Sequence, residues 1–287
     1  MKVCVIDVGS NSVRIMFSEN GLTIKKNNIV TRLGKGVNDY PFLLTSSMQK
    51  TVDAIKLFHA QAKEYGAEKV YIFATAAVRS AKNKQEFIDF VKKETGLTVD
   101  VISGEQEAKL GLLGALNGKN GGIIDVGGAS SEVTVATADK ILYSYSLNLG
   151  SVRILDACGQ DKESIKNLCK KAVQEYGQVP LTNFYGIGGT ATTLASIAQE
   201  LEPYDPTKVH GYILTKEKVF SLAESLNAKP VEERKKVKGL QPERAEVISG
   251  GAYLIYYIMD YLNIESITVS ESDNLEGYLK VKEGNNE

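Results

Sequence analysis

Residues 5–12 of the chain read VIDVGSNS, and residues 123–131 read IIDVGGASS. Both stretches place a β-branched run before an Asp and a glycine-rich bend, after which apolar residues alternate again. This pattern predicts a strand, a tight turn and an antiparallel return strand. Because the pattern occurs twice, it indicates two similar domains. We expect the two bends to face each other across one cleft that binds a polyanion.

The residues of the two bends suit a phosphate ligand. Glycine lets backbone N–H groups converge where a side chain would block them. Asp7 and Asp125 each close a buried strand, and a carboxylate in that position can hold a metal ion. The other interpretation is that each Asp only starts the turn through bonds to the backbone, and the duplication weighs against it. Polar donors beside the bends are Ser10, Asn11, Ser130 and Ser131.

The composition is that of an ordinary globular protein, with 43% hydrophobic and 24% charged residues. A length of 287 residues favours two domains. The net charge of −1 argues against a general nucleic-acid binder, because such binding needs a basic surface. No apolar run approaches about 18 residues, and a strand pattern begins at once, so we expect neither a membrane segment nor a signal peptide.

Cysteine and histidine are scarce in this sequence. The three cysteines, Cys4, Cys158 and Cys169, lack the spacing of a metal site and fit buried thiols in a reducing cytoplasm. The two histidines, His59 and His210, argue against Ser-His-Asp hydrolysis and against a histidine-rich metal centre. We therefore expect a cytoplasmic protein whose anion site is built locally.

Strand and helix patterns alternate along the chain, which predicts an α/β fold with mixed sheets. The polar, glycine-rich residues 117–122 stand directly before the second copy of the motif and make the best joint between domains. We predict an N-terminal domain over residues 1–119 and a C-terminal domain over residues 120–287. Helical spacing covers about residues 45–65, 75–95, 103–118, 162–176, 191–201, 216–227 and 242–262. Strand patterns cover residues 69–74, 99–101, 183–187 and 266–269.

Two further segments suit an anion. Residues 186–190 read GIGGT at a strand-to-helix junction, where unpaired N–H groups favour a negative charge. Close packing of the strand on the helix is the other interpretation, and the two bends described above weigh against it. Thr75 and Arg79 offer a similar junction in the first half, although Arg79 also suits a surface salt bridge.

Several carboxylates are candidates for chemistry. Glu105 and Glu107 lie in the first turn of a helix that Ser103 and Gln106 begin as a capping box. Either glutamate can orient and deprotonate a water, as phosphoryl hydrolysis requires, or simply favour the helix dipole. Spacing does not separate the two. Glu132, in the returning strand, is either a second metal contact or an exposed strand residue.

Taken together, these segments resemble the exopolyphosphatase/guanosine-pentaphosphate phosphohydrolase (Ppx/GppA) family of the sugar kinase–Hsp70–actin superfamily. The resemblance implies an α/β chain of two ribonuclease H-like domains with mixed sheets flanking an interdomain cleft. It also implies a hydrolase dependent on Mg²⁺ (or Mn²⁺) that releases terminal phosphate from polyphosphate or guanosine pentaphosphate. The matching residues are 6–12, 32–36, 74–79, 102–108, 124–132, 188–190, 209–212 and 242–245.

The resemblance also assigns roles to individual residues. Glu107 becomes the catalytic base, because it matches the second glutamate of the family's Ser-Gly-x-Glu-Glu-Ala pattern. Asp125 and Glu132 become the protein ligands of the metal. The residues implied to bind substrate phosphates are Asp7, Gly9, Ser10, Asn11, Arg14, Arg32, Thr75, Arg79, Gly127, Gly128, Ser130, Gly188, Gly189 and Thr190.

The sequence departs from the family pattern in three places. Gln106 replaces the first glutamate of the pair, which leaves Glu107 as the base that the pattern supplies. Ala129 and Ser131 stand where Gly and Thr are usual. Residues 270–277 read SESDNLEG and lack the Arg of the family's Ser-x-x-Gly-Leu-Arg-Glu-Gly.

Two other functions remain open at this point. The first is an ATP-dependent kinase or ATPase of the same superfamily, and the second is a non-catalytic sensor of phosphate or alarmone. The segments at 32–34 and 103–108 match the hydrolase branch, and the presence of Glu107 argues against a sensor. For partners we expect no nucleic acid and no membrane, and a homodimer is the common default.

Overall fold

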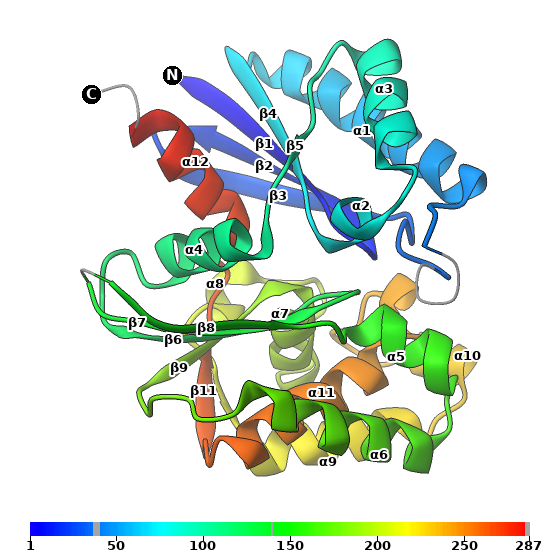
Figure 1. Cartoon of the computed structure of the whole chain (residues 1–287), viewed down its shortest axis with the longest axis vertical. Coiled ribbons are helices and arrows are strands. Elements are labelled where there is room, and N and C mark those ends of the chain that lie inside the picture. The colour runs from blue at the N-terminus through cyan, green and yellow to red at the C-terminus, as the bar shows by residue number, and fades with distance from the viewer. Residues whose placement is uncertain (37–40, 139, 285–287) are drawn as a thin grey trace. The chain divides into compact units, whose positions relative to one another are not determined.

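The computed structural model describes residues 1–36, 41–138 and 140–284 (Figure 1). The chain forms two compact units, and each unit contains one mixed β-sheet with helices packed on it. The first unit comprises Met1–Leu110 together with Asn274–Glu287, and the second comprises Gly111–Asp273. No helix in the described ranges is both long and apolar enough to cross a membrane.

The sheet of the first unit is a three-stranded antiparallel meander followed by two parallel strands. β1 (Lys2–Val8) pairs with β2 (Ser12–Glu19), and β2 pairs with β3 (Leu22–Val30), both antiparallel. β4 (Lys69–Ala74) lies parallel to β1, and β5 (Asp100–Val101) lies parallel to β4. The order β3-β2-β1-β4-β5 is therefore mixed, as the sequence predicted.

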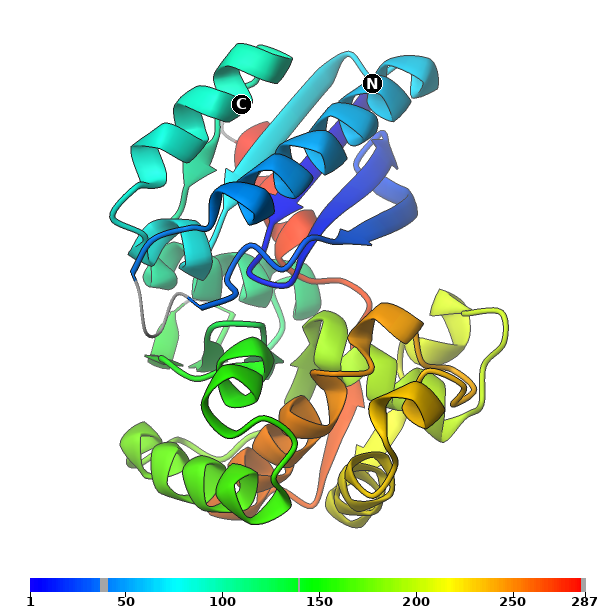
Figure 2. The ribbon, with the colours of Figure 1, turned by 90° about the vertical axis from the view of Figure 1, so that its right-hand side faces the viewer.

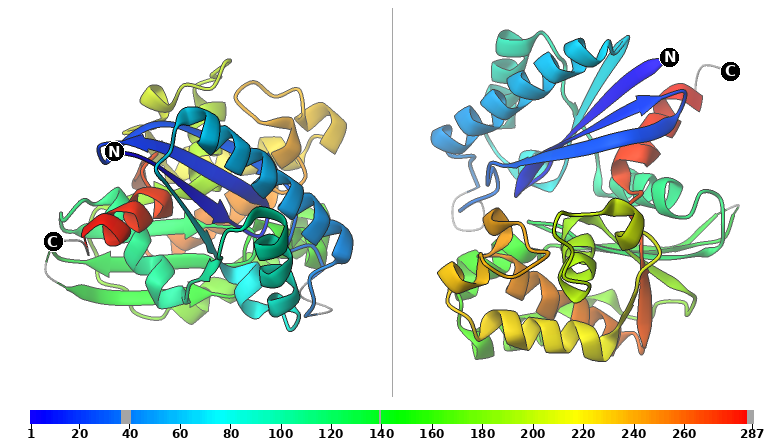
Figure 3. Two further views of the ribbon diagram at one scale, coloured as in Figure 1. Left: turned by 90° about the horizontal axis from the view of Figure 1, so that it is seen from above. Right: turned by 180° about the vertical axis from the view of Figure 1, so that it is seen from behind.

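β1 is buried on both faces of this sheet, which is why its apolar run is continuous. Alternate residues of a strand point to opposite faces. One set of β1 residues shares a core with α1 (Thr45–Tyr65) and α3 (Lys84–Thr95). The other set shares a smaller core with Tyr278 and its neighbours on α12 (Asn274–Gly284). Figure 3 shows α1 and α12 on opposite sides of the sheet.

The sheet of the second unit repeats this order. Its strands run β10-β11-β9-β6-β7-β8, so β8-β7-β6-β9-β11 corresponds to the five strands of the first unit, and β10 is an addition. β6 pairs antiparallel with β7 and parallel with β9, just as β1 pairs with β2 and β4. The strands are β6 (Gly121–Val126), β7 (Ser131–Ala136), β8 (Ile141–Leu147), β9 (Phe184–Ile187), β10 (Ile213–Thr215) and β11 (Ser266–Val269).

Helices cover both faces of the second sheet. The larger core lies between one face and helices that include α6 (Lys162–Ala172), α9 (Lys216–Asn227) and α11 (Ile248–Tyr261), which Figures 1 and 2 show on that side. The other face packs against Leu112 and Leu116 at the end of α4 (Gly104–Ala115). The remaining helices are α2 (Ala76–Ser80), α5 (Ser151–Cys158), η1 (Val173–Tyr176), α7 (Gly188–Ala198), α8 (Pro206–Val209), α10 (Val231–Arg234) and η2 (Pro242–Arg244).

Several predicted elements match the structure at both ends, namely α1, α9, β4 and β11. Others are shorter than expected. The helix predicted over 103–118 ends at Ala115, and the helix predicted over 242–262 is a 3₁₀ turn followed by α11. Elements that the sequence analysis did not predict are β3, β10, α5, α8, α10 and α12.

The division into units also differs from the predicted domains, 1–119 and 120–287. The boundary falls inside α4, and the C-terminal helix α12 belongs to the first unit rather than the second. The reason is packing: the Tyr278 ring stacks on Phe73 with centroids 4.6 Å apart, and its hydroxyl donates to Asp100 Oδ2 at 2.8 Å. These contacts bury α12 against the sheet of the first unit.

A glycine allows α12 to approach α4 closely. A Cβ atom placed on Gly277 would lie 1.9 Å from the carbonyl oxygen of Leu110, which no real side chain can do. Gly284, on the same helix, has nothing within 4 Å of that position. The two glycines therefore lie on one helix but differ in the room available for a Cβ atom.

We expect Gly277→Ala to destabilise the protein by about 1–3 kcal/mol, because the added methyl group forces α12 away from Leu110. Gly284→Ala should be neutral or slightly stabilising, because alanine favours a helix and meets no neighbour. Urea unfolding of both variants checks this. Equal midpoints for the two variants would contradict the packing described here.

Candidate active site

The two glycine bends predicted from the sequence have the same closure. Gly9 N–H donates to Ser12 O at 3.0 Å, and Gly127 N–H donates to Ser130 O at 3.0 Å. In each case the bend joins the first two antiparallel strands of its sheet. The duplication seen in the sequence is therefore a duplication of backbone structure.

The first bend is held by residues 31–34. Asn11 O accepts hydrogen bonds from the N–H groups of Thr31 (3.0 Å) and Arg32 (2.9 Å). Ser10 O accepts from Gly34 N–H at 2.8 Å, and a Cβ on Gly34 would meet Ser10 Cβ at 2.9 Å. The Arg-Leu-Gly segment thus fixes the bend through its backbone, and Arg32 stands directly beside it.

Asp7 and Arg14 form an ion pair across this hairpin. The two residues are cross-strand partners on β1 and β2, and the Arg14 guanidinium contacts Asp7 Oδ2 at 2.5 and 3.0 Å. Asp7 is 4% exposed. Arg14, which the resemblance assigns to substrate phosphates, therefore neutralises a buried carboxylate in this structure.

The junction after β4 brings Arg79 to Glu107. Arg79 Nη1 lies 2.9 Å from Glu107 Oε2 and also donates to the carbonyl of Ile102 at 3.0 Å. Glu107 is buried, at 8% exposure. The guanidinium supplies a counter-charge to this buried carboxylate. Thr75, which precedes α2, is also buried, and its N–H donates to Val8 O.

Burial separates Glu107 from Glu105, which spacing did not. The Glu105 side chain is 73% exposed and pairs with Lys109 at 2.8 Å. The hydrogen bond from Lys109 lowers the pKa of Glu105. The predicted capping box is confirmed: Ser103 N–H donates to Gln106 Oε1 and Gln106 N–H donates to Ser103 Oγ. Glu107 therefore faces inward on the first turn while Glu105 faces solvent.

The second bend is held by α5, a helix that the sequence analysis did not predict. Ser151 N–H donates to Gly127 O at 2.9 Å, and Val152 N–H donates to Gly128 O at 2.8 Å. Gly150 permits this approach, because a Cβ there would lie 2.6 Å from the Gly128 backbone. Carbonyl oxygens of both bends therefore accept hydrogen bonds from backbone N–H groups of the protein.

Asp125 and Glu132 lie opposite each other on β6 and β7. Side chains of directly opposed residues share one face of a sheet, so the two carboxylates are neighbours. Glu132 is 3% exposed and accepts a hydrogen bond from Ser146 at 2.6 Å. Two adjacent carboxylates suit a hard divalent cation whose other ligands are waters and phosphates. No cluster of three or more potential metal ligands occurs in the part of the chain that the structure describes.

The start of α7 lies against Asp125. A Cβ on Gly188, which has a φ of +75°, would lie 2.3 Å from Asp125 Oδ1. Thr190 donates its hydroxyl proton to the Val126 carbonyl at 2.6 Å, so this side chain ties α7 to the second bend. Ser131 is also occupied: its hydroxyl is fully buried against Tyr176, 2.8 Å away, and burial raises the pKa of that phenol.

Arg244 belongs to this region, although the sequence analysis gave it no role. Its guanidinium covers Gly189, where a Cβ would lie 2.4 Å from Nη1. Its Nε donates to Gln241 Oε1 at 3.2 Å. The sequence did indicate this segment, because residues 242–245 match the family pattern, but the match assigned no role to Arg244.

The predicted site residues therefore gather in two groups. The first unit contains the first bend together with Asp7, Arg14, Arg32, Thr75, Arg79 and Glu107. Asp125, Glu132, the second bend and residues 188–190 belong to the second unit, together with Arg244.

Three curated relatives match most of the chain. A bifunctional 3-dehydroquinate synthase/phosphatase of Fusobacterium nucleatum is 32% identical over 95% of the chain and 45% of its own length. Exopolyphosphatase 2 of Mycobacterium tuberculosis is 26% identical over 96% of the chain and 97% of its own length. A guanosine-5′-triphosphate,3′-diphosphate pyrophosphatase of Photobacterium profundum is 29% identical over 95% of the chain and 57% of its own length. The chain thus spans about half the length of the first and third relatives.

A solved structure shows the same fold. The Aquifex aeolicus member of the Ppx/GppA protein family superposes with a TM-score of 0.80 at 30% identity, covering 100% of this chain and 99% of that one. This likeness confirms the predicted actin-like pair of α/β domains. The model of the Ppx/GppA phosphatase family matches residues 3–285. The chain belongs to the Ppx/GppA phosphatase family.

Proposed function

We propose that the chain is a divalent-cation-dependent hydrolase that releases terminal phosphate from inorganic polyphosphate or guanosine pentaphosphate. The observation that carries the proposal is the buried Glu107 carboxylate, held 2.9 Å from the Arg79 guanidinium. In this proposal Glu107 acts as the base, and the neighbouring Arg79 guanidinium binds phosphate. Relatives named for polyphosphate and for guanosine-5′-triphosphate,3′-diphosphate support both substrates.

In the mechanism we propose, Glu107 accepts a proton from a water molecule. The water oxygen bonds to the terminal phosphorus while the bond from that phosphorus to the bridging oxygen breaks. The leaving phosphate keeps the electron pair of that bond and takes up a proton from solvent. Arg79 stabilises the charge on the transferred group, and we assign further phosphate oxygens to the polar residues of the first bend.

Asp125 and Glu132 are the residues that we propose to hold the cation. Mg²⁺ or Mn²⁺ would supply neutralisation of phosphate charge there, because hard cations prefer carboxylate and phosphate oxygens. Asp125 lies against Gly188 at the start of α7, and Glu132 accepts a hydrogen bond from Ser146. The protein's part is therefore to keep both carboxylates on one face of the hairpin.

The direct test is phosphate release from polyphosphate, guanosine pentaphosphate and ATP in parallel. Release from either of the first two substrates supports the proposal. Activity on ATP alone would replace it with an ATPase, and no release from any of the three would overturn it.

Glu107→Gln should lower the turnover number by about 10²-fold or more, because the amide cannot accept the proton. Glu105→Gln is the matched control, since this exposed glutamate lies on the same helical turn and should change the rate little. Steady-state rates on polyphosphate give the comparison. Similar small effects of the two substitutions would remove Glu107 from the mechanism.

Phosphate release should cease in excess EDTA and return when Mg²⁺ or Mn²⁺ is added. Asp125→Asn should raise the cation concentration for half-maximal rate by about 10-fold or more, because one charged ligand is lost. Asp260→Asn, at an exposed position of α11, is the control and should leave that concentration unchanged. Full activity in EDTA would exclude the proposed cation site.

Gly188→Ala should lower the rate of phosphate release, because the new methyl group displaces Asp125. This loss of rate should exceed that of a control variant with a similar loss of stability. Gly118→Ala is the control: its φ of +81° imposes similar backbone strain, and nothing lies within 4 Å. Both variants should lose similar thermal stability. If Gly118→Ala impairs hydrolysis as much as Gly188→Ala does, displacement of Asp125 is not the cause.

A further inference from the structure

The second unit buries an arginine that forms no ion pair with any carboxylate of the described residues. Arg234, in α10, is 1% exposed, and burial lowers the pKa of its guanidinium. All of its hydrogen bonds go to neutral oxygens. Burying a charge without a counter-charge is costly, and an apolar side chain of similar length would pack there at lower cost. Stability alone therefore does not account for an arginine at this position.

The hydrogen bonds of Arg234 tie together segments that lie apart in the sequence. Its Nη1 atom donates to Gln160 Oε1 at 2.9 Å, to the Ala245 carbonyl at 2.8 Å and to Ser249 Oγ at 3.1 Å. Its Nη2 atom donates to the carbonyl of Lys229 at 3.0 Å. These acceptors lie on the turns after α5 and α9, directly after η2, and on α11. A guanidinium presents several donors in a fixed geometry, so one side chain can serve all of these acceptors.

Gln160 holds the same stretch of backbone as Arg234. Its Nε2 atom donates to the carbonyl of Glu246 at 2.9 Å, while its Oε1 atom accepts from Arg234. Asn227 Nδ2 in turn donates to the Gln160 carbonyl at 3.3 Å. The consecutive carbonyls of Ala245 and Glu246 are therefore held by two side chains that are bonded to each other.

These two carbonyls directly follow Arg244. The Arg244 N–H donates to the Gln241 carbonyl at 2.9 Å within η2, and its Nε donates to Gln241 Oε1 at 3.2 Å. Its guanidinium covers Gly189, where a Cβ would lie 2.4 Å from Nη1. A shift of residues 245–246 therefore moves this guanidinium relative to the start of α7, and shifts of about 1 Å are enough to impair a site.

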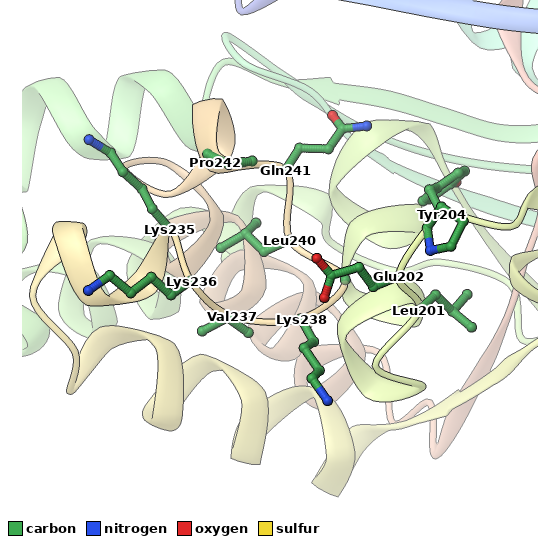
Figure 4. Close-up of a pocket in the computed structure, with 12 residues that line it drawn as sticks. Leu201, Glu202, Tyr204, Lys235, Lys236, Val237, Lys238, Leu240, Gln241 and Pro242 are labelled. Carbon is green, nitrogen blue, oxygen red and sulfur yellow. The ribbon is translucent and has the colours of Figure 1, made fainter.

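The loop between Arg234 and Arg244 is closed by this network. Residues 235–241 form neither helix nor strand, and together with residues 201–204 they line a pocket of about 290 Å³. Figure 4 shows the side chains of the three lysines at 235, 236 and 238 extending outward from the loop. Part of the loop thus borders solvent rather than packed side chains, and the bond from Arg234 to the Ala245 carbonyl joins its two ends.

The start of α11, which the same network holds, lies against two helix starts of the candidate site. A Cβ on Gly251 would lie 2.7 Å from Thr190 Cγ2 and 3.4 Å from Ser151 Cβ. Thr190 lies in the first turn of α7, and Ser151 begins α5. The network therefore supports the surroundings of the second bend as well as Arg244, and all of its contacts lie within the second unit.

We propose that Arg234 and Gln160 are positioning residues, which set the Arg244 guanidinium against the start of α7 so that it binds an oxyanion of the substrate phosphate. The inference rests on the proposed function, because it takes the start of α7 as the place of a phosphate. Arg234 itself is buried, so it acts through Arg244 rather than on the substrate. A guanidinium is required here because it reaches carbonyl, amide and hydroxyl acceptors together.

A double-mutant cycle on a short polyphosphate tests this inference. Arg244→Ala should lower kcat/KM by about 10-fold or more, because a charged contact to phosphate is lost. Arg234→Met should lower kcat/KM by about 5-fold or more in the wild-type background but by less than about 2-fold in Arg244→Ala. Arg234→Lys should restore part of the loss, because the ammonium keeps some of the donors. Equal factors in the two backgrounds, or no effect of Arg234→Met, would overturn the inference.

Tyr253→Phe controls for loss of stability. Tyr253 is buried on α11 and donates to Glu224 Oε1 at 2.7 Å, so this variant should lose thermal stability and keep its kcat/KM. An equal fall in kcat/KM for Tyr253→Phe and Arg234→Met would contradict positioning. If Arg234→Met does not fold, Gln160→Leu takes its place in the cycle, because Gln160 is only half-buried and its loss frees the Glu246 carbonyl. Its effect should depend on Arg244 in the same way.

A binding measurement separates the inference from the proposed function. The probe is a tripolyphosphate whose bridging oxygens are replaced by methylene groups, so that it binds without being hydrolysed. By calorimetry its Kd should rise by about 5-fold or more in Arg234→Met and in Arg244→Ala, and the double variant should match Arg244→Ala. If this pattern holds while the wild-type protein hydrolyses no substrate, positioning stands and the proposed function fails. If polyphosphate is hydrolysed and the two substitutions act additively, the proposed function stands and positioning fails.

Discussion

Both groups of candidate site residues, one in each unit, depend on one backbone constraint. This constraint is the tight bend between the first two antiparallel strands of each sheet. Gly9 and Gly127 close these bends with hydrogen bonds of equal length. The carbonyl oxygens of the bends are bonded to residues 31–34 in one unit and to the start of α5 in the other. The protein thus holds the bends in shape by itself, and little ordering remains to oppose ligand binding.

Two buried carboxylates of the first unit are each paired with an arginine. Arg14 neutralises Asp7, and Arg79 neutralises Glu107, so neither carboxylate is buried alone. Each carboxylate therefore keeps a counter-charge within hydrogen-bond distance in the folded protein.

The sequence revealed those parts of the fold that local pattern controls. The Asp-Gly repeat and the capping box at Ser103 are local, and both have the expected form. β3 carries the polar run Lys25–Asn28 at the edge of its sheet, so its pattern reads as a loop. Features set by tertiary contacts could not be predicted from the sequence. Burial distinguishes Glu107 from Glu105, and strand register pairs Arg14 with Asp7. Packing brings Arg244 to Gly189.

The place of α12 affects how the protein is made. A ribosome releases residues 1–110 long before residues 274–284, yet the apolar cluster around Phe73 needs Leu275, Tyr278 and Leu279 from that last helix. One face of the first sheet stays exposed to water until α12 has been synthesised. The second unit, which is continuous in sequence, has every residue of its core available earlier. The nascent chain therefore completes its second unit before its first.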